Sequence, residues 1–175
     1  TLRAFRDEVL KEKVEALLTN SSYQEKLFDL LVESGDLISA ENFLVNSALP
    51  DKENHFLNLF YWEGKSEKAC EKVANVMRAS PSLDIRAQNV YCLYINGEKE
   101  RAKIALELLK ETGKPVTPLL EALFDPSLDI SFEEEVGNSP FLLTLWCALQ
   151  KKIPEKTLKT LSPAALVLIA NGKNM

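Results

Sequence analysis

Three stretches decide the fold of this chain: Glu33-Ser34-Gly35-Asp36, Trp62-Glu63-Gly64-Lys65 and Ile95-Asn96-Gly97-Glu98. Each glycine follows a large apolar residue by four positions and precedes an alanine by five, which is Ala40, Ala69 or Ala102. A tight turn between two helices needs glycine for its left-handed conformation, and a small residue lets the two backbones approach closely. Such a pair cannot bury its apolar face alone, so it stacks on the next. The pattern therefore predicts stacked antiparallel helical hairpins and an all-α fold.

Helix boundaries elsewhere are indicated by glycine and proline. The six glycines all fall where a helical apolar pattern stops, the typical position of a C-terminal cap. A capping hydroxyl stands before proline, which predicts a helix start, at Ser80-Pro81, Thr117-Pro118, Ser139-Pro140 and Ser162-Pro163. Alternating β-branched runs, the usual mark of strands, are nearly absent from the sequence.

The repeated pattern resembles the tetratricopeptide (TPR) repeat, whose turn has the form Gly-Asp-x-x-x-Ala and whose unit ends on proline. The segment from Gly64 through Ala69 to Pro81 keeps the family spacing, and the segment from Gly97 ends one residue late, at Pro115. The resemblance covers roughly residues 21–115 and implies a TPR-like α-solenoid.

The resemblance departs from the family pattern in the first helix of each unit. The tryptophan typical of that helix is replaced by Gln24, Glu53 and Arg86. The small residue expected in the middle of that helix is replaced by a bulky one, namely Phe28, Leu57 and Val90. These larger side chains are expected to hold the paired helices farther apart than in the consensus repeat.

The chain is expected to form one helical-repeat domain over residues 1–175, within which the repeats have flanking helices on both sides. Residues 1–20 form an N-terminal amphipathic helix whose stripe packs on the array or pairs with a partner, residues 21–115 form three helix pairs, and residues 116–175 form C-terminal capping helices. A loop from Asp125 to Gly137 precedes the apolar helix 141–149. Short helices over 154–161 and 163–170 are expected to cap the exposed end of the array.

Composition excludes several classes of function. The chain has 46% hydrophobic residues, and its 21 basic against 26 acidic residues give a net charge of -5. This charge disfavours nucleic-acid binding, which calls for a basic surface. The longest apolar run has seven residues, Ala164 to Ala170, against about 20 for a membrane span. Cytoplasm is the default location. Because the chain does not begin with Met, it can be a fragment from which a targeting segment was removed.

Chemical motifs are sparse. The three cysteines Cys70, Cys92 and Cys147 are too few and too odd in number for a disulfide framework, and they are interpreted as buried free thiols in a reducing compartment. The lone histidine, His55, has no partner motif, so it is interpreted as a packed or solvent-facing residue. Glu133-Glu134-Glu135 lacks the ligand spacing of a calcium loop. Neither a cofactor nor a metal is indicated, and no enzymatic activity is expected.

The TPR resemblance implies a binding groove lined by the first helix of each unit. Carried onto this chain, its positions are Asn54, Asn58, Tyr61 and Trp62, then Ala87, Tyr91, Tyr94 and Ile95, and in the weaker first unit Glu25, Asp29, Val32 and Glu33. The hypothesis is a non-enzymatic interaction module that binds a peptide or helix of a partner through Asn54, Asn58, Tyr61, Trp62, Tyr91 and Tyr94.

The alternative interpretation of the groove aromatics is that they are ordinary inter-helix packing. The chain is then a structural subunit that docks through its terminal apolar helices, 2–18 or 141–149, and has no peptide groove. The groove positions carry no basic residue, so an uncharged or basic partner segment is favoured over an acidic C-terminus. Homo-oligomerisation is left open by the sequence.

Overall fold

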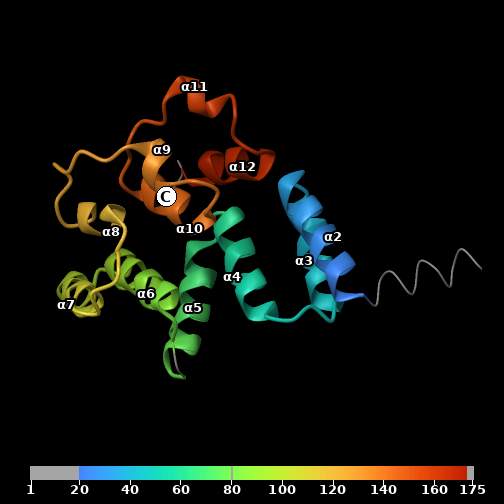
Figure 1. Cartoon of the computed structure of the whole chain (residues 1–175), viewed down its shortest axis with the longest axis horizontal. Helices are drawn as coiled ribbons and strands as arrows, with labels where there is room; N and C mark the ends of the chain where they lie inside the picture. The colour runs from blue at the N-terminus through green and yellow to red at the C-terminus, as the bar shows by residue number, and fades with distance from the viewer. Residues whose placement is uncertain (1–19, 80, 173–175) are drawn as a thin grey trace, which may run out of the picture.

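A computed structural model describes residues 20–79 and 81–172, and all the regular structure in these ranges is helical (Figure 1). The predicted all-α class is therefore confirmed. The predicted N-terminal helix over residues 2–18 lies outside the described residues. Within the described ranges, every helix is too short or too polar to cross a membrane.

The chain contains three pairs of consecutive helices. Within each pair, a tight turn at Gly35, Gly64 or Gly97 joins the two helices. The pairs are α2 (Ser21–Glu33) with α3 (Leu37–Asn46), α4 (Lys52–Trp62) with α5 (Ser66–Met77), and α6 (Leu83–Ile95) with α7 (Lys99–Lys110). The helices of each pair contact each other. In addition, α3 contacts α4 and α5 contacts α6, so neighbouring pairs are also packed together.

The three turns are built by the same hydrogen bonds. The Gly64 N–H donates to the Tyr61 carbonyl and the Lys65 N–H donates to the Phe60 carbonyl, and the turns at Gly35 and Gly97 repeat this arrangement. This pair of hydrogen bonds closes a helix in the Schellman motif, which requires a left-handed residue at the glycine position. Gly64 has a φ of 71°, so the predicted role of the glycines as C-terminal caps holds at these turns.

Close packing of each pair depends on the alanine five residues after the glycine. Ala40, Ala69 and Ala102 are fully buried. A larger side chain at these positions would separate the two helices, because a protein interior leaves few voids to absorb added volume. The sequence pattern of glycine and alanine therefore marks the turn and the contact point of each pair.

Three of the four predicted helix starts are observed. The hydroxyl oxygens of Thr117, Ser139 and Ser162 each accept a hydrogen bond from a backbone N–H in the first turn of the helix that begins at the next proline. The fourth, Ser80-Pro81, is wrong. Helix α6 begins two residues after Pro81, where Ser82 accepts from the Ile85 N–H and serves as the N-cap.

The C-terminal third folds back onto the first helices of the pairs. It contains α8 (Pro118–Ala122), α9 (Phe132–Glu135), α10 (Pro140–Ala148), α11 (Glu155–Leu158) and α12 (Pro163–Gly172). Helix α10 packs on α4 and α8, while α12 packs on α10, α4 and α2 (Figure 1). The expectation that the segment 163–170 caps the exposed end of the array is therefore wrong. The segment 125–137 also contains the short helix α9, where a loop was expected.

Two hydrophobic clusters form the core. The larger cluster joins α4, α5, α6, α7 and the C-terminal helices, and the smaller one joins α2, α3 and α4 to Ala164 of α12. Trp62 is half-buried and packs against both clusters. Helix α12 also lies on the turns of the first two pairs. At the turn of the second pair, for example, a Cβ placed on Gly64 would stand 2.8 Å from the Asn171 Cβ.

Candidate functional site

Two of the three tyrosines expected in the groove are buried in the core. Tyr61 is 0% exposed and Tyr91 is 2% exposed. Phe141 of α10 lies between them, with its ring centroid 5.4 Å from that of Tyr61 and 6.0 Å from that of Tyr91. Burial raises the pKa of both phenols above the ordinary value. Helix α10 therefore fills the part of the groove where the resemblance placed these two rings.

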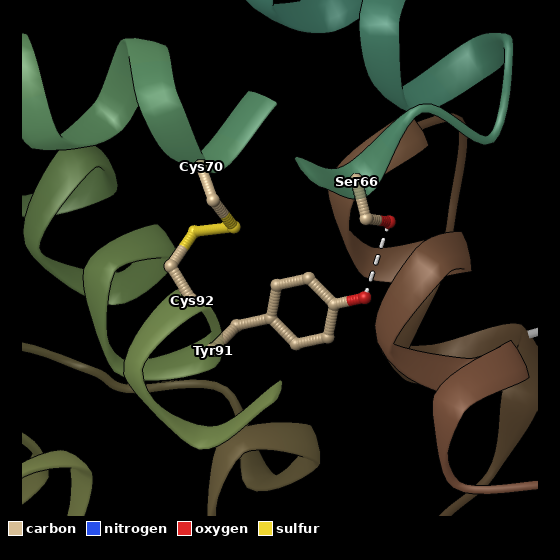
Figure 2. The surroundings of a disulfide bond; sticks show 4 residues. All are labelled: Ser66, Cys70, Tyr91 and Cys92. Carbon is tan, nitrogen blue, oxygen red and sulfur yellow. Dashed lines mark hydrogen bonds between the residues drawn. A yellow bond between two sulfur atoms is a disulfide. The ribbon is translucent and has the colours of Figure 1, made fainter. Parts of the chain in front are cut away.

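The two buried hydroxyls differ in their partners. The Tyr91 hydroxyl donates to Ser66 Oγ at 3.3 Å (Figure 2). This bond lowers the Tyr91 pKa, but burial is the larger effect and the net shift is upward. The Tyr61 hydroxyl has no hydrogen-bond partner among the residues that the structure describes. A buried polar atom without a partner reduces the free energy of unfolding by about 1–3 kcal/mol.

A disulfide joins α5 to α6, which corrects the interpretation of the cysteines. Cys70 and Cys92 are linked, with their Cα atoms 5.3 Å apart, and both are buried. Figure 2 shows the Tyr91 side chain leaving the same turn of α6 as the disulfide and reaching Ser66 on α5. Cys147 of α10 is half-buried and outside the disulfide. The free-thiol argument for a reducing compartment therefore fails.

The remaining predicted residues lie in three different environments. Tyr94 is half-buried, and its ring packs edge-on against Phe124 at 5.5 Å. Asn54 is exposed at the start of α4, where its Nδ2 donates to Asp51 Oδ2 at 2.6 Å. Trp62 packs between the two clusters, as described above. Asn58 is exposed and lines a cavity. The six residues are thus divided among core, surface and cavity wall.

The cavity has a volume of about 420 Å³ and lies where α6 meets the connection between α7 and α8 and the start of α10. This volume falls within the range of about 300–1,000 Å³ that is typical of ligand pockets. The apolar part of its wall consists of Leu83, Ala87, Leu109, Pro115, Val116, Phe141 and Leu142. The polar part consists of Asn58, Asp84, Gln88, Thr112, Lys114, Thr117 and Ser139.

Gln88 is the polar residue of this wall with an open hydrogen-bonding position. Its side chain is on α6 and is only 8% exposed. Its Oε1 atom accepts no hydrogen bond from any group in residues 20–79 or 81–172. A buried amide oxygen is an expensive atom to leave unpaired. Gln88 lines the cavity, and its buried Oε1 becomes an acceptor for a ligand N–H or O–H once the side chain turns toward the cavity.

Gln88 is not among the residues predicted from the sequence, because the TPR resemblance points to the aromatic groove positions. A signal was present, since Gln88 follows Ile85 by three residues and precedes Tyr91 by three, which places an amide on the apolar face of α6. A buried amide in such a stripe needs a partner. The contributions of α10 and of residues 112–117 depend on the long-range packing and have no local signal.

His55 is half-buried, and its ring lies edge-on to Phe28 with centroids 5.0 Å apart. Among the described side chains, no group of three or more His, Cys, Asp and Glu is placed to hold a metal ion. Compared with family models, curated proteins and solved structures, the chain gives no significant match.

Proposed function

We propose that this chain is a non-enzymatic interaction module built from TPR-like helix pairs that binds a short segment of a partner protein. Two observations support the TPR-like description. The same hydrogen bonds form the turns at Gly35, Gly64 and Gly97, and the alanine that follows each turn is buried. The binding site is the cavity beside α6, rather than an open groove along the first helices, because α10 occupies the region around Tyr61 and Tyr91.

The observation that carries this proposal is the unpartnered Oε1 of Gln88 in the wall of the cavity. A peptide backbone N–H is a suitable donor for this atom, and the exposed Asn58 amide at the same cavity can bond a backbone as well. Leu83, Ala87 and Leu142 provide an apolar surface for one side chain of the ligand. Burial of such a side chain supplies affinity, and the amides fix the direction of the peptide.

The net charge of the chain, -5, favours an uncharged or basic ligand. The cavity wall itself has one acidic residue, Asp84, and one basic residue, Lys114. A strongly acidic peptide or a nucleic acid is therefore disfavoured, because its charge has the same sign as the net charge of the protein.

The alternative function, a subunit that docks through terminal helices, loses one of its two surfaces. Phe141, Leu145 and Trp146 of α10 are buried within this chain. Helix α10 thus serves as core and is not free for another protein. The second surface, residues 2–18, lies outside the described part of the chain.

The experiment is a selection from a random 12-residue peptide library, followed by affinity measurements on individual peptides. We expect the selected peptides to share an apolar residue flanked by neutral or basic ones. Ala87→Trp, which fills the cavity from its wall, should abolish binding, and Gln88→Leu should weaken it about tenfold through loss of one hydrogen bond.

Ile104→Trp is the matched control, because Ile104 is exposed on α7 at 61% and lies away from the cavity wall. Circular dichroism checks that each variant is folded. Selected peptides that bind Ala87→Trp as tightly as the wild type would show that the cavity is not the site. A library without any enriched pattern would remove the support for peptide binding altogether.

The disulfide gives a separate indication of location. Disulfides persist in oxidising compartments and are rare in the cytosol. From the Cys70–Cys92 link we infer an oxidising compartment in place of the cytoplasm. Thiol labelling of the protein in intact cells, before any reductant is added, tests this: labelling of Cys70 or Cys92 would contradict it.

A further inference from the structure

An apolar stripe on α2 is exposed in the described structure. It consists of Tyr23, Leu27 and Leu30, spaced by four and three residues along one side of the helix. Leu30 is 62% exposed. The side of α2 that packs in the core, through Gln24 and Phe28, lies about 110° around the helix from this stripe. Helix α2 thus has a second apolar side next to its buried contacts.

The positions equivalent to Leu30 are covered in α4 and α6. Counted back from the turn glycine, Leu30 corresponds to Leu59 of α4 and to Cys92 of α6. Leu59 is 0% exposed and Cys92 is 5% exposed. Tyr23 likewise corresponds to Ile85 of α6, which is buried. The same position of the repeat is therefore buried in the second and third pairs and open in the first.

The helix that covers these positions is in each case the preceding one in the chain. Leu59 belongs to the same cluster as Ala40 and Leu44 of α3. Cys92 is bonded directly to Cys70 of α5. Helix α2 has no preceding helix in the part of the chain that the structure describes. The packing rule of the second and third pairs thus predicts one more helix before α2.

We propose that a helix within residues 2–18 of this chain covers the stripe of Tyr23, Leu27 and Leu30. This segment carries its own apolar stripe, made of Leu2, Phe5, Val9, Leu10 and Val14. The connections before α4 and α6 are each five residues long, 47–51 and 78–82. A connection of equal length before α2 starts at residue 16 and leaves about 14 residues, about 21 Å of helix, which matches the length of α2.

Charge at the C-terminal end of α2 agrees with this intramolecular pairing. In α2 and its flanks, the exposed charged residues are Glu25, Lys26, Asp29, Glu33 and Asp36, which are mostly acidic. A preceding helix that runs opposite to α2 brings Arg3 and Arg6 to the end of α2 where Glu33 lies. Cations are also favourable near the C-terminal end of a helix.

The test is amide hydrogen exchange of the 1–175 chain, followed by mass spectrometry of peptides from residues 2–18. We expect these amides to be protected in the wild type and to exchange at least about tenfold faster in Leu30→Asp. Ile104→Asp is the matched control, since Ile104 is equally exposed on α7, and it should leave the protection unchanged. Peptides from α4 and α10 report whether each variant is still folded.

Each other outcome overturns the proposal. An unprotected segment in the wild type means that it does not cover α2. Protection that survives in Leu30→Asp means that the segment packs elsewhere. Protection that disappears on dilution, together with a dimer in light scattering, means that a second copy supplies the helix. If Leu30→Asp also deprotects α4, the milder Leu30→Ser gives the same comparison in a folded chain.

Discussion

Replacement of Tyr61 by phenylalanine distinguishes a core tyrosine from a groove tyrosine. The Tyr61 hydroxyl is fully buried and has no hydrogen-bond partner among the described residues. Its removal leaves the ring in contact with Phe141 and eliminates the cost of the unpaired oxygen. We therefore expect Tyr61→Phe to raise the free energy of unfolding at pH 7 by about 1 kcal/mol.

The effect should grow at alkaline pH. Burial raises the pKa of Tyr61 in the folded chain, whereas the unfolded chain ionises at its ordinary pKa of about 10. The free energy of unfolding of the wild type is therefore unaffected by this group below pH 10. It falls as the pH rises further, because the unfolded state releases a proton that the folded state retains. At pH 11 this costs the wild type about 1 kcal/mol, which the phenylalanine variant does not lose.

The assay is urea unfolding followed by circular dichroism at pH 7 and pH 11, with Cys147→Ser in every variant to prevent thiol exchange. Tyr94→Phe is the matched control, because Tyr94 is only half-buried and its hydroxyl is not a buried atom without a partner. The gain from Tyr61→Phe should thus rise from about 1 to about 2 kcal/mol between the two pH values. An equal gain at both, or a loss at pH 7, would refute the reasoning and place the hydroxyl at a polar surface.

Two further predictions concern the turns and the disulfide. Gly64→Ala should lower the free energy of unfolding by about 1–2 kcal/mol because of its positive φ. The loss should be about 1 kcal/mol larger than that of Gly97→Ala, because a Cβ at position 64 would meet Asn171, whereas a Cβ at position 97 meets no described atom within 4 Å. Equal losses in urea unfolding would contradict the packing of α12 on this turn. Replacement of Cys70 and Cys92 by alanine should lower the free energy of unfolding by about 3 kcal/mol, since the disulfide closes a loop over a sequence separation of 22. Peptide mapping without reductant should recover the linked pair, and three titratable thiols would exclude it.

The sequence predicted the local features well. The turns at Gly35, Gly64 and Gly97 were found because a Schellman cap is formed within six consecutive residues. Ala69 was found because close packing of two helices joined by a short turn has a fixed spacing. The start of α6 was placed too early because both Ser80 and Ser82 are suitable caps, and the position of Pro81 between them favoured the wrong one.

The candidate site was predicted only in part, for a physical reason. Asn58 was expected at a binding surface and lines the cavity, but Tyr61 and Tyr91 are covered by Phe141, which is 80 and 50 residues away in sequence. Such contacts leave no periodic pattern in the chain. The Cys70–Cys92 link was missed for a similar reason, because two cysteines on different helices become neighbours only once the helices are packed.

The position of α12 has a consequence for how the protein acquires its fold during synthesis. Asn171 Nδ2 donates to the Glu63 carbonyl across 108 residues, and Ala164 completes the cluster of the first helix pair. A linear array whose units touch only their neighbours can fold progressively as it leaves the ribosome. Here the first pair stays incomplete until α12 has been translated. A nascent chain that ends before Pro163 is therefore expected to expose Phe28 and Leu44 and to be a target for chaperones.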